Sequence, residues 1–248
     1  MTDKLLNTAE AARFLRVSQA SVRRWSDSGL LRARRVGRRR ERRFTEADLK
    51  RFLSPAGAGP NAAQDAVQKE VFISGTPIPV HSHIATFYDS DEGRLRLTVP
   101  FLREGLLRGQ PCFLAAAGEV LDAYMAALRK EEGIDIDSAI RNGMFVAMRG
   151  PGDKADSAVV FWERALSNAL AAGPTLIRVV GEMSSERTLF VSDDEMIAYE
   201  VAFNGIAKRF PTVTLCQYDA RAFTGEVVFH ALRAHPDLYS VGIASFLN

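Results

Sequence analysis

The chain has 248 residues, of which 47% are hydrophobic and 25% are charged, and its formal net charge is +2 at pH 7. This composition is typical of a folded globular protein and excludes a largely disordered or fibrous chain. No apolar run reaches the roughly 18 residues that a membrane-spanning helix needs. The first residues, 1–7, lack the apolar segment of a secretion signal, so we expect a cytoplasmic protein without a membrane partner.

The two cysteines, Cys112 and Cys216, lie far apart, each inside an apolar run. Buried free thiols are favoured over a disulfide in the reducing compartment expected here. No group of Cys and His residues has the spacing of a zinc site. His230 and His235 are five residues apart, which fits one face of a helix poorly. We therefore expect neither a bound metal nor another cofactor.

The small net charge conceals a strong asymmetry along the chain. Residues 1–53 contain 15 Lys and Arg against 6 Asp and Glu, a net charge of +9, whereas the remaining residues have a net charge of −7. Residues 54–63 are small, uncharged and rich in Pro and Gly, which is typical of a linker. The sequence thus predicts a basic domain over 1–53, a linker over 54–79 and an acidic domain over 80–248. A basic module of this kind favours nucleic acid as its partner.

The basic domain has the pattern of a helix-turn-helix. Thr8 is predicted to cap a first helix that runs to about residue 15, and Ser18 to cap a second helix over about 19–28, ended by Gly29. On the second helix, Val22 and Trp25 share an apolar face. Since successive residues are about 100° apart, Arg23 and Arg24 are expected to point away from that face. This arrangement suits a recognition helix that enters a DNA groove.

The arginine-rich stretch 32–44 is predicted to form a hairpin wing that turns at Gly37. Residues 45–48, Thr-Glu-Ala-Asp, predict a capped final helix that ends near residue 53. The expected core of this domain consists of Phe14, Val22, Trp25, Phe44 and Leu49. Two alternatives stay open: the arginine run is a solvated face or an unstructured arm, and Arg23 or Arg24 contacts phosphates only.

Residues 5–53 resemble the MerR superfamily, and within it the small excisionase-like and BldC-like modules. The resemblance rests on Val22, Arg24, Trp25, Gly29, Leu31, Arg43, Phe44, Asp48 and Leu49. It implies sequence-specific binding of double-stranded DNA and a nucleoid-associated location. The long dimerising helix of larger MerR regulators is missing, so a homodimer is expected to form through the C-terminal domain. The expected DNA contacts are Gln19, Ser21, Arg23, Arg24, Arg35, Arg38, Arg39, Arg40, Arg42 and Arg43.

From residue 83 onward, short apolar runs alternate with amphipathic stretches. Strands are predicted over 84–88, 112–116, 144–148, 175–180 and 212–216, and helices over about 92–107, 120–130, 154–172, 193–210 and 225–234. This alternation favours a three-layer α/β domain with a mainly parallel sheet that is covered on both faces. About 168 residues are enough for one substantial core.

The passages 83–120, 178–183 and 216–236 resemble the methanogen/methylotroph sensory domains, the MEDS family. The likeness covers about residues 80–248, and members of that family join this sensor to a MerR-like DNA-binding domain in the same order. The domain also distantly resembles the RecA/KaiC ATPase core. However, residues 87–94 hold one glycine, no lysine and three carboxylates where a P-loop needs a lysine and a hydroxyl. We therefore expect no enzymatic activity.

A small-molecule pocket is expected where the parallel strands end, because ligands of such sheets bind outside the carboxyl ends of the strands. The candidate ligand-binding residues are His83, Tyr88, Asp89, Glu119, Arg178, Glu182, Tyr218, Asp219 and Arg221. Structural roles remain open for several of them. The two tyrosines would then be core residues, His83 a satisfied structural group, Asp219 and Arg221 an ion pair, and Glu182 a helix cap or a partner of Arg178 or Arg187.

Together these features predict a one-component transcriptional regulator, which we expect to act as a repressor. Its N-terminal domain would bind operator DNA, and its C-terminal domain would bind a small-molecule effector of unknown identity. The alternative is an accessory or architectural DNA-binding protein whose C-terminal domain docks a protein partner. A third reading, a degenerate ATPase, requires ATP turnover that depends on Glu182.

Overall fold

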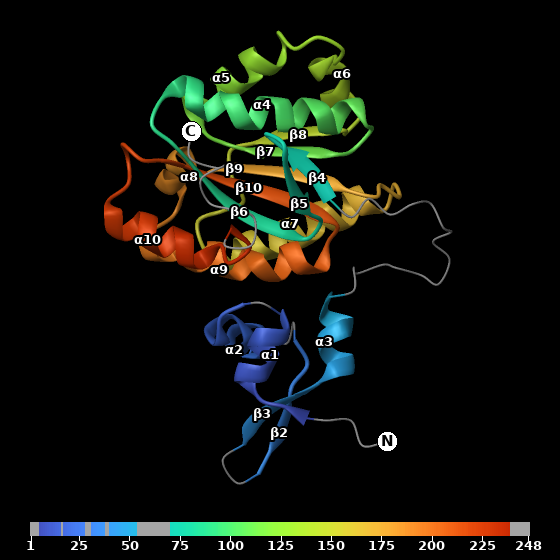
Figure 1. Ribbon diagram of the computed structural model, residues 1–248, viewed down its shortest axis with the longest axis vertical. Coiled ribbons are helices and arrows are strands. Elements are labelled where there is room, and N and C mark those ends of the chain that lie inside the picture. Colours follow the sequence, from blue (N-terminus) through green and yellow to red (C-terminus); the bar gives the residue numbers. More distant parts are fainter. Residues whose placement is uncertain (1–4, 16, 28–30, 38–39, 54–69, 239–248) are drawn as a thin grey trace.

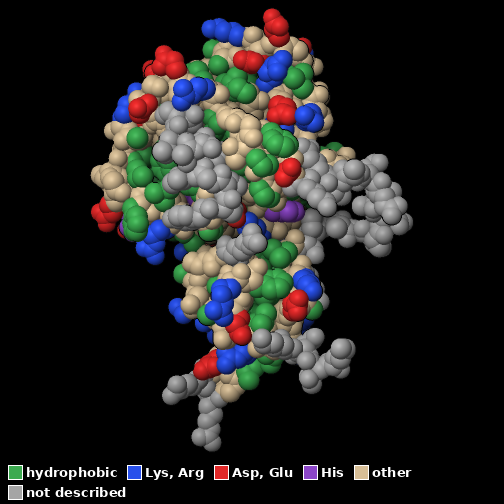
Figure 2. Space-filling view, in the orientation of Figure 1, with side chains coloured by type: hydrophobic (Ala, Val, Ile, Leu, Met, Phe, Trp, Pro, Cys, Tyr) green, Lys and Arg blue, Asp and Glu red, His purple; other side chains and the backbone are tan. Residues whose placement is uncertain are grey.

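A computed structural model of the chain describes residues 5–15, 17–27, 31–37, 40–53 and 70–238. These residues form a small N-terminal lobe and a larger C-terminal lobe that meet at a waist (Figures 1 and 2). Within the described ranges, no helix has both the length and the apolar character that crossing a membrane requires.

The N-terminal lobe is the expected helix-turn-helix with a hairpin wing. Its elements are β1 (Leu5–Leu6), α1 (Thr8–Leu15), α2 (Gln19–Asp27), β2 (Arg34–Val36), β3 (Glu41–Thr45) and α3 (Glu46–Leu53). β3 pairs antiparallel with β1 and with β2. Gly37 has a φ of 75° where the wing turns, a conformation that glycine adopts without strain. The predicted hairpin around Gly37 is therefore confirmed.

The helix caps follow the sequence pattern closely, with one exception. Ser18 accepts the amide of Ser21 at 3.1 Å, and Thr45 accepts the amide of Asp48 at 3.0 Å, so both predicted caps are confirmed. The cap of α1 is Asn7 rather than Thr8. Its Oδ1 accepts the amide of Glu10 at 2.9 Å, and the Glu10 carboxylate accepts the amide of Asn7 at 2.8 Å.

The prediction that Phe14 belongs to the core of this lobe is wrong. The side chain of Phe14 is 37% exposed, because α1 turns Ala11, Ala12 and Leu15 toward the core instead. The other expected core residues, Val22, Trp25, Phe44 and Leu49, are buried together in one cluster. Gly29, the predicted end of α2, lies outside the described residues.

The C-terminal lobe is an α/β domain around five parallel strands in the order β6-β10-β9-β7-β8. The strands are β6 (Ser82–Tyr88), β7 (Cys112–Ala115), β8 (Phe145–Met148), β9 (Ile177–Glu182) and β10 (Thr212–Asp219). The helices are α4 (Asp91–Leu107), α5 (Gly118–Leu128), α6 (Ile136–Arg141), α7 (Ala155–Leu170), α8 (Met183–Glu186), the 3-10 turn η1 (Arg187–Leu189), α9 (Asp193–Arg209) and α10 (Gly225–Ala234). All five predicted strands are present, and the predicted fold class is confirmed.

The helices form two layers (Figure 1). α4, α5 and α6 cover one side of the sheet, whereas α7, α9 and α10 cover the side that faces the N-terminal lobe. The strands β6, β7, β9 and β10 are almost completely buried because both faces of the sheet are covered, which explains their near-continuous apolar sequences. Cys112 and Cys216 are buried free thiols, as expected.

The predicted linker extends too far along the chain. Residues 70–79 form an antiparallel hairpin of β4 (Glu70–Ile73) and β5 (Thr76–Pro79). Val71, Ile73 and Ile78 alternate inward and are buried in the core of the α/β domain. The hairpin is therefore part of that domain, and its period-2 apolar pattern is the signal that distinguishes it from the Pro/Gly-rich stretch before it.

Candidate DNA interface and sensor site

A concave, basic surface lies between the wing and the two helices of the helix-turn-helix. It encloses about 660 Å³ and is lined by Asn7, Thr8, Ala9, Gln19, Arg23, Arg35, Arg40, Glu41, Arg42 and Arg43. Six of the ten predicted DNA contacts thus come together on one surface: Gln19, Arg23, Arg35, Arg40, Arg42 and Arg43. Guanidinium groups suit this place because their planar fork can donate two hydrogen bonds to a phosphate or a guanine edge.

Acidic residues orient the arginines of the wing. Asp27, the last residue of α2, accepts from Arg42 at 2.5 Å and from Arg35 at 3.1 Å. The hydrogen bond from Arg42 is the main cause that lowers the pKa of Asp27. Arg43 pairs with Glu41 at 2.7 Å. Exposed pairs of this kind are weak because water competes for both partners, so phosphate groups can displace the carboxylates.

The remaining predicted DNA contacts lie elsewhere. Ser21 is buried, and its hydroxyl oxygen lies 2.9 Å from that of Ser18 within the capping turn. Arg38 and Arg39 lie outside the described residues. Arg24 is half-buried, and its Nη1 donates to the carbonyl of Ala198 on α9 at 3.0 Å. A DNA contact of Arg24 stays a prediction, and in this structure the guanidinium joins the two lobes.

Trp25 continues the contact between α2 and the C-terminal lobe. Its indole packs against the tilted ring of Phe52 with ring centroids 5.0 Å apart, and its edge lies against the backbone of α9 at Gly205. A Cβ atom at Gly205 would lie 2.6 Å from Cζ2 of Trp25, so only glycine permits this approach. The Arg209 guanidinium lies 5.6 Å from the Phe52 ring and forms an ion pair with Glu163. The helix α2 therefore has one side toward the basic surface and another docked on α9.

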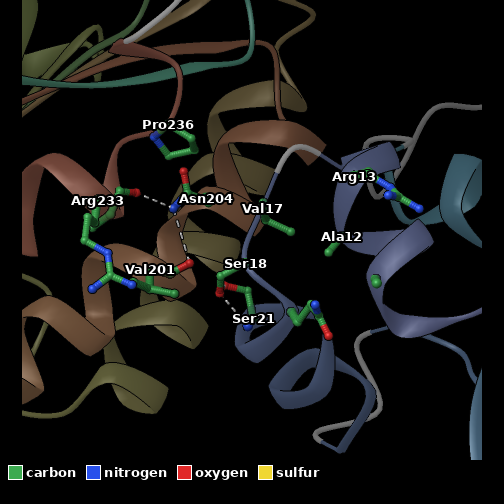
Figure 3. A pocket seen from close by; sticks show the side chains of 12 residues that line it. Ala12, Arg13, Val17, Ser18, Ser21, Val201, Asn204, Arg233 and Pro236 are labelled. Atoms are coloured by element: carbon green, nitrogen blue, oxygen red, sulfur yellow. Dashed lines mark hydrogen bonds between the residues drawn. The ribbon is translucent and has the colours of Figure 1, made fainter.

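Beside this contact, a cleft of about 590 Å³ opens between the lobes (Figure 3). Ala12, Arg13, Val17 and Ser18 line it from the N-terminal lobe, and Val201, Asn204, Arg233 and Pro236 from the C-terminal lobe. The Asn204 amide donates to the carbonyl of Ala234 at 2.7 Å, which connects α9 with the end of α10 at the wall of the cleft.

Part of the predicted ligand site forms one cluster at the carboxyl ends of β6, β9 and β10. The Tyr88 hydroxyl donates to Glu182 Oε1 at 2.7 Å. Glu182 is fully buried and also accepts the amides of Ser184 and Ser185, at 3.3 and 2.8 Å, which caps α8. Burial, followed by the Glu182 charge, raises the pKa of Tyr88. The helix-cap alternative for Glu182 is thus realised, and a ligand contact remains a prediction.

Among the other predicted ligand residues, Asp219 and Arg221 have structural partners. Arg221 donates to Asp219 at 2.7 Å and to Asp91 at 3.2 Å, so the expected ion pair with Asp219 is present. Tyr218 is fully buried, whereas Asp89 and Glu119 are exposed at the rim. Ligand binding by these residues stays a prediction.

Two of the predicted ligand residues lie at the opposite ends of their strands. Arg178 is the second residue of β9 and is fully buried; it donates to Gln110 at 2.8 Å and to the carbonyl of Phe101 at 2.7 Å. About 13 Å of strand separate it from Glu182, at roughly 3.3 Å per residue. His83 is the second residue of β6. The structure does not bring these two residues into the cluster around Glu182.

His83 belongs instead to a second cluster, which the sequence analysis missed. It lies with Glu200 of α9, Cys216 of β10 and His235 after α10, and their potential ligand atoms are all within 4.8 Å of one another. The four residues are far apart in the sequence and belong to four separate elements, so no short sequence spacing indicates the cluster. Only the parallel pairing of β6 with β10 and the packing of α9 on both bring them together.

Comparison with known proteins gives the same two parts. Residues 82–236 match the family described as MEDS, the MEthanogen/methylotroph, DcmR Sensory domain, and residues 5–55 match a helix-turn-helix domain. The transcriptional repressor DcmR of Methylorubrum extorquens (strain DSM 6343 / CIP 106787 / DM4) is 37% identical over 247 residues, which cover 96% of this chain and 92% of that protein. A solved structure, the flagellar accessory protein FlaH from Methanocaldococcus jannaschii, matches 71% of this chain and 76% of its own with 14% identity and a TM-score of 0.40.

The sensory-domain match covers more than half of the chain, and the likeness to the repressor extends along nearly all of it. The chain therefore belongs to the MEDS family, with a helix-turn-helix domain in front of the sensory domain.

Proposed function

We propose that this protein is a one-component transcriptional repressor. Its helix-turn-helix binds operator DNA, and its sensory domain binds a small-molecule effector that changes how α2 is docked on α9. The similarity to a transcriptional repressor supports the first part. The observation that carries the second part is the position of α2, which contributes Arg23 to the basic surface and Arg24 and Trp25 to the contact with the sensor.

DNA binding is assigned to the basic surface. Arg23 and Gln19 on α2 are the candidates for base contacts, since the exposed side of a recognition helix enters the major groove. The wing arginines Arg35, Arg40 and Arg42 are the candidates for phosphate contacts, which set position and affinity without reading sequence.

The effector is assigned to the carboxyl edge of the sheet, beside Tyr88, Glu182 and Asp219. Only a few residues of the chain separate this edge of the sheet from the helix on which α2 is docked. Glu182 caps α8, which continues through η1 into α9, and Arg187 of η1 pairs with Asp193 at the start of α9 at 2.6 Å. An effector that changes the hydrogen bonds of Glu182 would thus shift the start of the helix on which α2 is docked. It must favour one docking geometry, because equal affinity for both would change nothing.

The sensory domain is also the proposed dimer interface. A two-fold symmetric dimer would present two basic surfaces to two half-sites, whose separation equals one helical turn of DNA or a multiple of it. The effector would then alter the distance between the two recognition helices.

The test starts with the full-length chain and a pool of random duplexes. The proposal expects enrichment of one sequence, ordinarily with two related half-sites. Thermal unfolding against a panel of metabolites and nucleotides then identifies the effector, because a ligand of the folded state raises the midpoint. That effector must also change the affinity for the selected duplex. If the chain enriches no sequence, the proposal of a transcriptional regulator is refuted. If the chain hydrolyses ATP and Glu182→Gln abolishes the turnover, the protein is an enzyme instead.

Thermal stability also separates the proposal from an accessory DNA-binding protein. A sensory domain that only docks a protein partner gives no shift with any small molecule, and the selected duplex then binds equally in the presence and absence of the whole panel.

A further inference from the structure

The cluster of His83, Glu200, Cys216 and His235 lies in the interior of the sensory domain, between the sheet and the helical layer that faces the N-terminal lobe. All four side chains are between 0 and 3% exposed. His83 Nε2 lies 3.0 Å from Glu200 Oε2 and 3.1 Å from Cys216 Sγ, and His235 Nε2 lies 3.0 Å from the same Glu200 oxygen. Two nitrogens, one oxygen and one sulfur therefore converge on one point.

Each imidazole is oriented from its other nitrogen. His235 Nδ1 lies 2.7 Å from the carbonyl oxygen of Ala231, and His83 Nδ1 lies 3.3 Å from Oδ1 of Asn204. The Asn204 amide nitrogen is committed to the carbonyls of Ala234 and Glu200, which leaves its oxygen toward His83. Because both oxygens only accept, both Nδ1 atoms carry the proton. In the neutral imidazoles, the Nε2 atoms then present lone pairs to the centre of the cluster.

Hydrogen bonds among the four side chains can satisfy only some of these polar atoms. The Cys216 thiol can donate to His83 Nε2, and a protonated His235 can pair with Glu200. His83 Nε2 and Glu200 Oε2 would nevertheless remain two acceptors 3.0 Å apart. Neither carboxylate oxygen of Glu200, nor His235 Nε2, has a hydrogen bond of good geometry among the described residues. Buried polar atoms without partners are rare in folded proteins, and a bound water or ion is one of the usual reasons.

The burial of the cluster points to a cation as well. Glu200 and both imidazoles are completely buried. An ionised carboxylate in such a place is stable only when it is paired, and a metal ion that it coordinates supplies the opposite charge.

We propose that His83, Glu200, Cys216 and His235 bind one divalent transition-metal ion of the zinc type. Imidazole, carboxylate and thiolate are the ligands that zinc takes in proteins, and tetrahedral coordination places such atoms about 3.3–3.6 Å apart. The contacts of 3.0 and 3.1 Å within a cluster no wider than 4.8 Å bracket these separations. The oriented Nδ1 atoms correspond to the outer hydrogen bonds that metal-bound histidines ordinarily make.

Four protein ligands leave no open coordination position, so the ion is structural or regulatory rather than catalytic. It would cross-link β6, β10, α9 and the end of α10. Glu200 lies on α9 between Ala198 and Gly205, which both contact α2, and Asn204 lines the cleft between the lobes (Figure 3). Any effect of the ion on DNA binding rests on the proposed function, whereas the metal site itself does not.

The experiment uses the full-length chain. Metal content is measured by plasma mass spectrometry as isolated and after chelator treatment followed by titration with Zn²⁺ or Co²⁺. The site predicts one ion per chain, a higher unfolding midpoint with the ion, and a Co²⁺ form with tetrahedral d–d absorption and a thiolate-to-cobalt charge-transfer band. A chain that holds no ion as isolated and takes up none on titration overturns the proposal, as does a Co²⁺ form without the thiolate band.

Matched variants identify the ligands. Cys216→Ser and His235→Gln should lower zinc affinity at least tenfold, and Asn204→Ala about 10- to 100-fold through the orientation of His83. Cys112→Ser and His230→Gln change the same residue types outside the cluster and should bind zinc as the original chain does. Unchanged affinity in Cys216→Ser and His235→Gln refutes the assignment. If those variants do not fold, a charge-transfer band that persists in Cys112→Ser still assigns the thiolate to Cys216, and its loss there overturns the assignment.

Discussion

A methyl group at position 205 is expected to separate the two lobes. In Gly205→Ala, the new Cβ would lie 2.6 Å from Cζ2 and 2.8 Å from Cε2 of Trp25, whereas carbon atoms pack at about 3.5–4.0 Å. The indole cannot simply yield, because Phe52 packs against it and the core of the N-terminal lobe surrounds it. The helices α2 and α9 must therefore move apart by about 1 Å.

This substitution should destabilise the contact between the lobes and should not destabilise the sensory domain itself. Alanine within a helix is favoured over glycine by about 0.5–1 kcal/mol, so α9 itself gains. Overpacking costs typically about 1–3 kcal/mol, which corresponds to a decrease of roughly 5- to 150-fold in the docked population relative to the separated one.

Acrylamide quenching of tryptophan fluorescence measures this change directly. The chain has two tryptophans, Trp25 at the junction and Trp162 in the core of the sensory domain, and they are 2% and 1% exposed. Separation of the lobes should expose Trp25 alone, so one of the two becomes accessible to the quencher. Gly225→Ala is the matched control, since nothing lies within 4 Å of a Cβ at that position. Quenching in Gly205→Ala equal to that of the original chain, with unchanged stability, would refute the docking contact.

Further substitutions test individual contacts. Arg23→Ala should reduce discrimination between the selected duplex and a scrambled one by about 1–3 kcal/mol, whereas Arg40→Ala should weaken binding to both and lower the salt slope by about one, as anisotropy titrations would show. Asp27→Asn should strengthen binding to every duplex in the same assay, because it removes the carboxylate that holds Arg35 and Arg42. Arg178→Met should destabilise the sensory domain in urea unfolding by about 1–3 kcal/mol, because the buried oxygens of Gln110 and Phe101 lose their donor.

Each of these expectations has an opposite outcome. Equal losses on both duplexes in Arg23→Ala would remove that residue from base reading. Weaker binding in Asp27→Asn would mean that the carboxylate chiefly positions the arginines for DNA. An unfolding midpoint of Arg178→Met within error of the original would show that the buried guanidinium contributes little net stability.

Features governed by neighbours along the chain could be predicted from the sequence. Ser18 and Thr45 cap their helices because a side-chain oxygen three residues upstream reaches a free amide, and Gly37 forms the wing turn because glycine tolerates positive φ. The misassigned cap of α1 differs by a single residue, since Asn7 and Thr8 both have suitable side chains. The parallel sheet followed from apolar runs alternating with amphipathic stretches.

Features that depend on packing between distant segments could not be predicted in this way. Periodicity placed Arg24 on an outward face of α2, but only the docked sensor shows that α9 covers that face. Phe14 was assigned to the core from its residue type, although smaller residues of α1 already fill the core. The cluster around His83 and Glu200 escaped notice because zinc spacings describe neighbouring ligands, whereas these ligands come from four elements.

The coupling between DNA and the sensory domain can be measured without knowing the effector. If the docking of α2 on α9 is linked to DNA binding, the selected duplex must affect α9 as much as the sensor affects DNA, because linkage is reciprocal. Hydrogen–deuterium exchange of the full-length chain should therefore change in residues 193–209 on addition of the selected duplex and stay constant with a scrambled one. Tight, specific binding with changes confined to residues 5–53 would contradict the link between the sensor and the DNA-binding helix.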